Sequence, residues 1–143
     1  MKTTMRTPQN LVLSCLASFL ILATTSVAGT EPKDMVVRIS EIEIAAAHLD
    51  QYKAILKEEA AASVELEPGV ISIFPMFQKD NPTQVRILEI YASQAAYDSH
   101  IKSAHFQKYK TTTLQMVKSL KLVDMTVIDP ASMIVIFSKL PKK

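Results

Sequence analysis

The chain contains one cysteine, two glycines and no tryptophan among its 143 residues. The cysteine, Cys15, lies in an N-terminal segment that we expect to be removed from the mature protein. The remaining domain therefore has no thiol for a disulfide bond, a nucleophile or a metal ligand. A domain of this size without disulfide bonds depends on its apolar core, and Val, Ile, Leu, Met and Phe are plentiful enough to form one.

An excess of positive charge is also missing once the N-terminal segment is set aside. The whole chain has 16 Lys and Arg against 14 Asp and Glu, which gives a net charge of +2. Lys2 and Arg6 supply that excess and residues 1–28 contain no acid, so the mature domain has 14 charges of each sign. Nucleic-acid-binding proteins present a basic surface, and we therefore expect no nucleic-acid partner.

Residues 1–28 have the three parts of a cleavable secretion signal. The start is positively charged, residues 11–23 form an apolar run, and Ser26-Val27-Ala28 offers small residues before a cleavage site at Gly29. A retained membrane anchor is the alternative, but a spanning helix needs about 20 apolar residues and this run is shorter. The sequence thus predicts a secreted or periplasmic protein with no membrane partner after cleavage. Its predicted parts are a signal at 1–28, a linker at 29–34 and one domain at 35–143.

Hydrophobic periodicity predicts the secondary structure of this domain. Residues 35–44 alternate as in a strand, and residues 45–66 carry an apolar stripe at helical spacing that Pro68-Gly69 ends. Turn residues at 79–82 predict a hairpin. A second helical pattern continues as far as Leu120, and a break near Ser103 is compatible with it. The expected strands are 35–44, 70–78, 84–91, 122–128 and 133–137, and the expected helices are 45–66 and 94–120.

This order of elements predicts an α+β fold of the ferredoxin-like, split βαβ type, β-α-β-β-α-β with an extra C-terminal strand. Such a fold has one antiparallel sheet with both helices on one face. The other face of the sheet also carries apolar residues and needs a cover. A second copy would supply it, because two-fold homodimers are the commonest closed assembly. The last strand, 133–137, is a candidate to cross to the partner.

Four segments in a fixed order carry a family resemblance. They are Ser40-Glu41-Ile42, Glu67-Pro68-Gly69-Val70, the strand 87–91, and the stretch 103–109 (SAHFQKY), which is the most specific. With these marks the chain resembles the antibiotic biosynthesis monooxygenase family, small dimeric α/β barrels that include cofactor-independent quinol oxygenases. The resemblance extends over roughly residues 36–129.

The resemblance implies a homodimer with a pocket in each subunit between the helices and the sheet. It implies oxidation of a quinol or phenolic ligand by O₂ without cofactors. Two alternatives stay open, namely a non-catalytic dimeric small-molecule-binding module and an isomerase of a small carbonyl signal. Haem chemistry is disfavoured, because the places of an amide, a Trp and a haem-ligating His in haem-degrading relatives hold Ile42, His100 and Lys110.

Histidines are the best candidates for removing a proton from a phenol, because the unperturbed pKa of imidazole is about 6.5. His100 and His105 lie in the second helical stretch, where the family that the chain resembles also has its histidines, whereas His48 lies at the start of the first helix and is expected to be a surface or capping residue. The alternative for His100 and His105 is a structural role, with hydrogen bonds to backbone carbonyls.

A metal site formed by these two histidines is not expected. Five residues of continuous helix turn by about 500°, which leaves the imidazoles about 140° apart. Zinc sites on helices prefer i, i+4 spacing, and no third ligand is evident in the sequence. A break near Ser103 would relax this geometry.

Five further residues are candidates on the strands and the second helix. Glu89 is a candidate catalytic residue that could orient a histidine or bond across a dimer, because a lone carboxylate in an apolar strand needs a partner. Tyr91 points to the same face. Tyr109 could bond to His105 or to a substrate hydroxyl. Arg38 could bind an anion or be solvated, and its face also carries Ile42 as a substrate contact.

Overall fold

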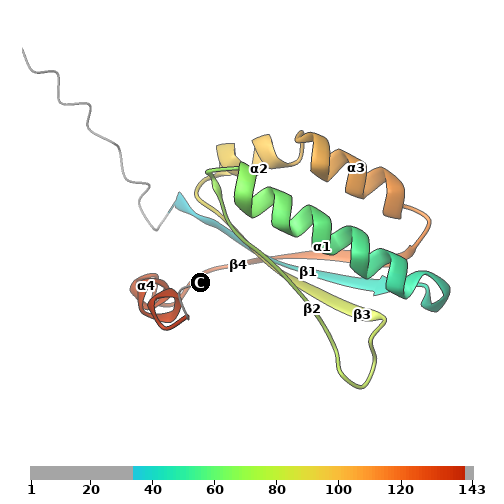
Figure 1. Ribbon diagram of the computed structural model, residues 1–143. Helices are drawn as coiled ribbons and strands as arrows, with labels where there is room; N and C mark the ends of the chain where they lie inside the picture. Colours follow the sequence, from blue (N-terminus) through green and yellow to red (C-terminus); the bar gives the residue numbers. More distant parts are fainter. Residues whose placement is uncertain (1–33, 141–143) are drawn as a thin grey trace, which may run out of the picture.

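The structure is a computed structural model that describes residues 34–140 (Figure 1). The predicted signal, and the predicted linker apart from Asp34, lie outside these residues. The elements are β1 (Val36–Ile44), the 3₁₀ turn η2 (Ala46–His48), α1 (Leu49–Leu66), β2 (Val70–Phe77), β3 (Gln84–Tyr91), α2 (Gln94–His100), α3 (Ala104–Thr113), β4 (Val117–Met125) and α4 (Ala131–Ser138).

The four strands form one antiparallel sheet in the order β2-β3-β1-β4. β1 lies in the middle, which explains why its apolar residues fall on both faces. β2 is an edge strand, as its Pro75 predicts, since proline cannot donate to a central ladder. Helices α1, α2 and α3 cover one face of the sheet (Figure 1). The predicted α+β ferredoxin-like fold is therefore confirmed.

Local sequence sets the ends of the helices that cover the sheet. α1 buries Tyr52, Leu56 and Ser63 along the predicted stripe. Side-chain oxygens cap α2 and α3, where Ser93 accepts a hydrogen bond from the Ala96 N–H at 3.2 Å and Ser103 accepts one from the Phe106 N–H at 3.3 Å. The cap at Ser103 starts a new helix, so the predicted break is confirmed and the helical stretch forms two short helices.

The predicted length of the second helical stretch is wrong. α3 ends at Thr113, and residues from Val117 form β4, whereas the sequence predicted helix to residue 120 and a strand at 122–128. The spacing of Met116 and Leu120 fits a helix, but Met116 lies in the turn after α3 and pairing with β1 places Leu120 in a strand. Leu120 lies opposite Ile42 in that ladder. Tertiary pairing thus overrides the local pattern.

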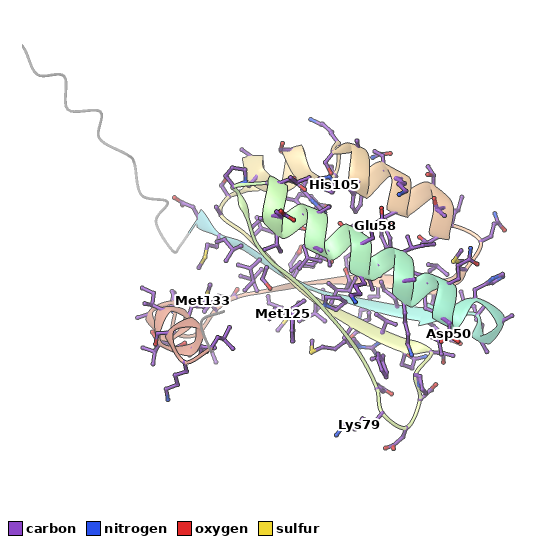
Figure 2. All side chains as sticks on the ribbon, in the orientation of Figure 1. Asp50, Glu58, Lys79, His105, Met125 and Met133 are labelled. Atoms are coloured by element: carbon purple, nitrogen blue, oxygen red, sulfur yellow. The ribbon has the colours of Figure 1, made fainter. Side chains whose placement is uncertain are left out.

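The predicted strand at 133–137 is also wrong, because residues 131–138 form helix α4. The Asp129 side chain accepts a hydrogen bond from the Ala131 N–H at 3.1 Å, and Pro130 stands at the start of the helix, where its missing N–H costs nothing. β1, in the middle of the sheet, already has a strand on each side. Figure 2 shows Met133 on α4, away from the layer formed by α1 and α3.

The core lies between the helical layer and the sheet. Its fully or nearly fully buried members include Ile44, Tyr52, Val85 and Tyr91. Among residues 34–140, no helix combines the length and the apolar character that a membrane span requires.

Candidate functional site

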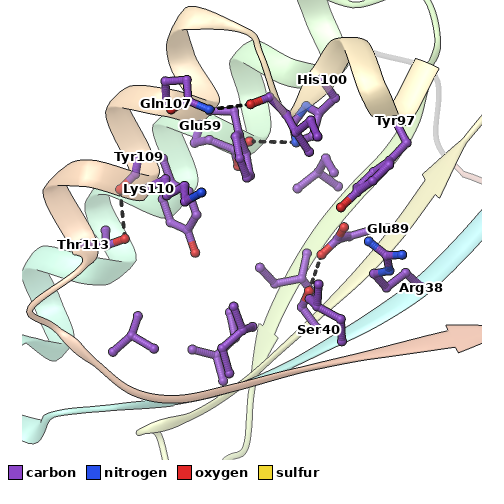
Figure 3. Close-up of a pocket in the computed structure, with 18 of the residues that line it drawn as sticks. Arg38, Ser40, Glu59, Glu89, Tyr97, His100, Gln107, Tyr109, Lys110 and Thr113 are labelled. Carbon is purple, nitrogen blue, oxygen red and sulfur yellow. Dashed lines mark hydrogen bonds and ion pairs between the residues drawn. The ribbon is translucent and has the colours of Figure 1, made fainter. Parts of the chain in front are cut away.

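A cavity of about 560 Å³ lies between the helices α1–α3 and the sheet (Figure 3). Its size is within the range of about 300–1,000 Å³ that is typical of small-molecule sites. The strands contribute apolar side chains to its floor and the helices contribute aromatic ones to its roof. Leu120 and Leu122 of β4 line it although they are 57% and 49% exposed, so this wall is open to solvent. Other lining residues are Ile42, Ile73, Ile87, Tyr97, Phe106 and Tyr109.

His100 supplies the imidazole of this cavity, and only 2% of the residue is exposed. Its Nδ1 lies 2.9 Å from Oε1 of Glu67, and its Nε2 lies 3.7 Å from Oε1 of Glu59 (Figure 3 shows the second contact). The rings of Phe106 and Tyr91 pack against it, with centroid distances of 4.8 and 5.3 Å. The ring is therefore held by carboxylates and aromatic packing, and the alternative of bonds to backbone carbonyls is not what the structure shows.

His105 shares the same carboxylate oxygen. Its Nε2 lies 2.5 Å from Oε1 of Glu67, and neither His105 nor Glu67 lines the cavity. The predicted separation of the two imidazoles by about 140° assumed a continuous helix. Because the helix is interrupted between His100 and Ala104, α3 starts in a new direction, and both imidazole rings contact Glu67. Figure 2 shows His105 where α3 meets α1.

Glu67, His100 and His105 form what we call the Glu67 cluster. Their three ligand atoms lie within 4.8 Å of one another, which is the spacing of side chains able to hold a metal ion. A third ligand was not evident in the sequence, because Glu67 precedes Pro68-Gly69 and is far from both histidines in the chain. The sequence does show a carboxylate directly before the Pro-Gly that ends the helix. Local sequence does not indicate, however, that this end of α1 lies next to α2 and α3.

Glu59 is a second functional candidate that the sequence analysis missed. It lies on α1, is 5% exposed and lines the cavity. Burial raises its pKa, and the Ser63 hydroxyl, which donates to its Oε1 at 2.8 Å, acts in the opposite direction. The sequence carried a signal, because Glu59 falls on the same helical stripe as Leu56 and Ser63 and is an acid among buried positions.

Glu89 lines the cavity at the sheet, and two hydroxyl groups hold it. Ser40 donates to its Oε1, and the Tyr91 hydroxyl donates to its Oε2 at 2.9 Å. It contacts neither histidine through a hydrogen bond among the described residues. Glu89 and Tyr91 are thus brought together, as their shared strand face predicts.

Tyr109 bonds to another tyrosine instead of His105. Its hydroxyl lies 2.7 Å from that of Tyr52. Burial raises the pKa of Tyr109 to about 12, and burial also raises the pKa values of Tyr52 and Tyr91. These three phenols stay protonated at neutral pH, so they serve as hydrogen-bonding groups and not as bases. His100 and the carboxylates remain as groups able to accept a proton.

Arg38 and Ile42, the predicted substrate contacts on the first strand, both line the cavity from β1. The Arg38 guanidinium pairs with Asp124 at 2.7 Å and lies 4.6 Å from the centre of the Tyr97 ring. These two contacts fix the position of the Arg38 side chain, which is 13% exposed, at the edge of the cavity. His48, by contrast, stands at the N-cap position of α1 but makes no side-chain capping bond.

The chain is similar in sequence and structure to proteins of one family. The family model of antibiotic biosynthesis monooxygenases matches residues 35–112. A crystal structure of a candidate antibiotic biosynthesis monooxygenase from Bacteroides thetaiotaomicron is 43% identical, with a TM-score of 0.69. The match covers 79% of this chain and 100% of that one.

Two further solved structures extend the likeness. A candidate monooxygenase from Lactobacillus acidophilus is 30% identical with a TM-score of 0.64, and the match covers 66% of this chain but 45% of that longer chain. A candidate antibiotic biosynthesis monooxygenase from Nitrosomonas europaea is 20% identical with a TM-score of 0.64, over 68% of this chain and 94% of that one, and shows the shared fold. No curated protein matches the chain.

Proposed function

The chain belongs to the antibiotic biosynthesis monooxygenase family, and from this we propose that it is an exported, cofactor-independent monooxygenase that oxidises a quinol or another phenol. The observation that carries the proposal is a buried imidazole, His100, at the wall of an aromatic-lined cavity, with the carboxylate of Glu67 behind it. The same cavity in a binding module would need no such carboxylate-held base.

His100 is the proposed base. With the proton of its neutral ring on Nδ1, the ring donates to Glu67 and leaves the lone pair of Nε2 free. A substrate hydroxyl can give its proton to this nitrogen, and Glu67 then stabilises the imidazolium that forms, as an orienting carboxylate does in a catalytic dyad. Glu59, 3.7 Å from Nε2, adds to this stabilisation when it is ionised.

The proposed reaction is balanced without an external reductant. A quinol anion has an electron-rich ring carbon that forms a bond to one oxygen atom of O₂. The O–O bond then breaks, one oxygen atom stays on the ring and the other leaves as water. The products are a hydroxyquinone and water, and the electrons come from the ring. The protein removes the first proton, and the apolar and aromatic side chains that line the cavity limit the contact of the anion with bulk water.

The lining supports an aromatic ligand. Tyr97 and Phe106 offer ring faces and edges, and Ile73 and Ile87 offer an apolar floor. The cavity of about 560 Å³ has room for a fused-ring quinol.

A homodimer is part of the proposal, and the outer face of the sheet supports it. Phe74, Leu88, Ile39 and Val123 lie opposite one another across all four strands and form what we call the outer row. Phe74 is 58% exposed. The row faces away from the helices, because adjacent residues such as Ile73 line the cavity on the other face. A second copy would bury this apolar surface.

The proposal that the protein is exported rests on the predicted signal at residues 1–28.

Oxygen uptake with a panel of hydroxylated naphthalenes and other fused-ring quinols tests the function. We expect uptake by the wild-type protein, incorporation of label from ¹⁸O₂ into the product, and no product without oxygen. His100→Gln should lower kcat by about 10²–10⁴-fold, the usual contribution of a positioned base. His48→Gln is the matched control, because His48 lies outside the cavity and should keep full activity.

Two outcomes would contradict the proposal. Product formation without oxygen would indicate an isomerase. Tight ligand binding by the wild-type protein, seen by quenching of tyrosine fluorescence, without turnover of any quinol would indicate a binding module. Measuring ligand affinity for His100→Gln separates loss of the base from loss of the fold, because a folded variant keeps its affinity while kcat falls.

A further inference from the structure

We propose that the Glu67 cluster is a binding site for a divalent cation of the zinc class. Its donor set is one carboxylate oxygen and two imidazole nitrogens, namely Oε1 of Glu67, Nδ1 of His100 and Nε2 of His105. Nitrogen-rich sets of this kind select zinc and its neighbours over magnesium or calcium, which prefer oxygen ligands.

The convergence of both imidazoles on a single oxygen is the first argument. The two nitrogens lie 2.9 and 2.5 Å from Oε1 of Glu67. A tetrahedral zinc ion, with ligands at about 2.0–2.2 Å, separates its ligand atoms by about 3.4 Å. A shift of the Glu67 carboxylate by less than about 1 Å therefore makes room for the ion. The three ligand atoms already lie within 4.8 Å of one another, so the site needs only small side-chain movements to accept the ion.

The second argument is the outer shell. A histidine that binds a metal through one nitrogen usually donates its other N–H to a carboxylate, which fixes the tautomer. When Nδ1 of His100 binds the ion, the ring proton moves to Nε2, which faces Glu59 at 3.7 Å. Ser63 holds Glu59 in turn, through a bond of 2.8 Å. Carboxylate, histidine and cation would thus form the chain of contacts typical of zinc sites.

Charge balance is the third argument. Glu59 and Glu67 have side chains that are 5% and 14% exposed. Over residues 34–140, the ion-pair partners of both are the cluster histidines, and no lysine or arginine pairs with either carboxylate. A dication would neutralise two carboxylates beside two neutral imidazoles. His105, 20% exposed, leaves an entry path from solvent.

The location of the cluster gives the cation a clamping role. Glu67 follows α1, His100 ends α2 and His105 lies in the first turn of α3, so one ion would tie together three elements. Glu67 and His105 do not line the cavity, so the ion would lie behind His100 and not against the substrate. If His100 is the base proposed above, an ion bound to Nδ1 keeps the ring proton on Nε2, so that this nitrogen cannot accept a proton from the substrate and turnover is suppressed. Binding itself does not depend on that proposal.

The test is a titration of the full chain, without a histidine tag and stripped with a chelator, with Zn²⁺ alone in a calorimeter. We expect one ion per chain, a rise in Tm, and a Co²⁺ absorption spectrum of tetrahedral type. His105→Ala and Glu67→Gln should abolish all three signals, and Glu59→Gln should weaken affinity by about 10–100-fold, as loss of an outer-shell partner does.

His48→Ala is the matched control and should bind zinc as the wild type does, because it removes the remaining histidine of the chain without touching the cluster. His105→Ala removes a half-buried side chain and is expected to fold, which circular dichroism checks. Equal zinc binding by the wild type and His105→Ala would overturn the proposal, and so would the lack of a Zn²⁺-dependent rise in Tm of the wild type. Neither result bears on quinol oxidation, which is measured without metal.

Discussion

At the scale of single residues, the site depends on acids held in apolar surroundings. Glu59, Glu67 and Glu89 are each less than half exposed, and each has side-chain partners that compensate its burial. A buried carboxylate without partners would be neutral or destabilising. The three acids thus set the orientation of the histidine and the hydroxyl groups that face the cavity.

Glu59 makes stability depend on pH. Burial raises its pKa in the folded protein above the ordinary value of about 4.3. A group with a raised pKa gives stability that is complete below the unfolded value and is lost as the pH rises through the folded value. Glu59→Gln, which stays neutral, should therefore lose less stability than the wild type as the pH rises above the unfolded pKa of about 4.3 and through the raised pKa of the folded protein.

Urea unfolding at a series of pH values measures this effect. The groups that face Glu59 are Ser63 on its own helix, His100 and His105 on α2 and α3, and Glu89 on β3, and all are kept in this variant. Glu58→Gln is the control, because Glu58 is exposed and pairs with Lys108 on the surface. An unchanged slope of stability against pH in Glu59→Gln would contradict the assignment.

At the scale of elements, the turn after α1 is packed against α2. A Cβ placed on Gly69 would lie 2.5 Å from the Cβ of Ala96, which is closer than two carbon atoms can approach. The Ala92 N–H also donates to the Gly69 carbonyl at 2.8 Å. This close contact fixes the start of α2, and through α2 it fixes His100.

Gly69→Ala should therefore destabilise the protein by about 1–3 kcal/mol, the usual cost of overpacking. Ala96→Gly should relieve the clash, although glycine within a helix costs about 1 kcal/mol by itself. In a double-mutant cycle measured by urea unfolding, the cost of Gly69→Ala should fall by more than half in the Ala96→Gly background. Additive effects of the two substitutions would show that the contact is not tight.

At the scale of the whole molecule, the outer row predicts association of two copies. Sedimentation equilibrium should show a dimer for the wild type. Phe74→Lys should raise the dimer dissociation constant by about 10-fold or more, because burial of an ammonium without a partner costs more than about 1.4 kcal/mol. Phe74 is 58% exposed in the single chain, so the substitution leaves the fold of the monomer intact.

Leu66→Lys is the matched control. Leu66 is 66% exposed at the end of α1, on the helical side of the sheet, and should not affect association. A wild-type monomer, or equal weakening by both substitutions, would show that the outer row is not the interface.

The sequence alone determined the β-α-β-β-α-β order of the elements up to β4, because strand alternation, helical stripes and turn residues are local patterns. Of the residues that the sequence named as site candidates, Arg38, Ile42, Glu89, Tyr91, His100 and Tyr109 line the cavity and His105 does not. Strand faces can be assigned to such residues without knowing how distant elements pack together.

Tertiary structure alone decided the rest. Pairing with β1 placed residues 117–120 in a strand, although their local pattern predicted a helix. Glu67 became the partner of both histidines because α1 ends where α2 and α3 meet, about 33–38 residues away along the chain. Contacts of that range depend on packing between elements, and local sequence patterns contain no information about them.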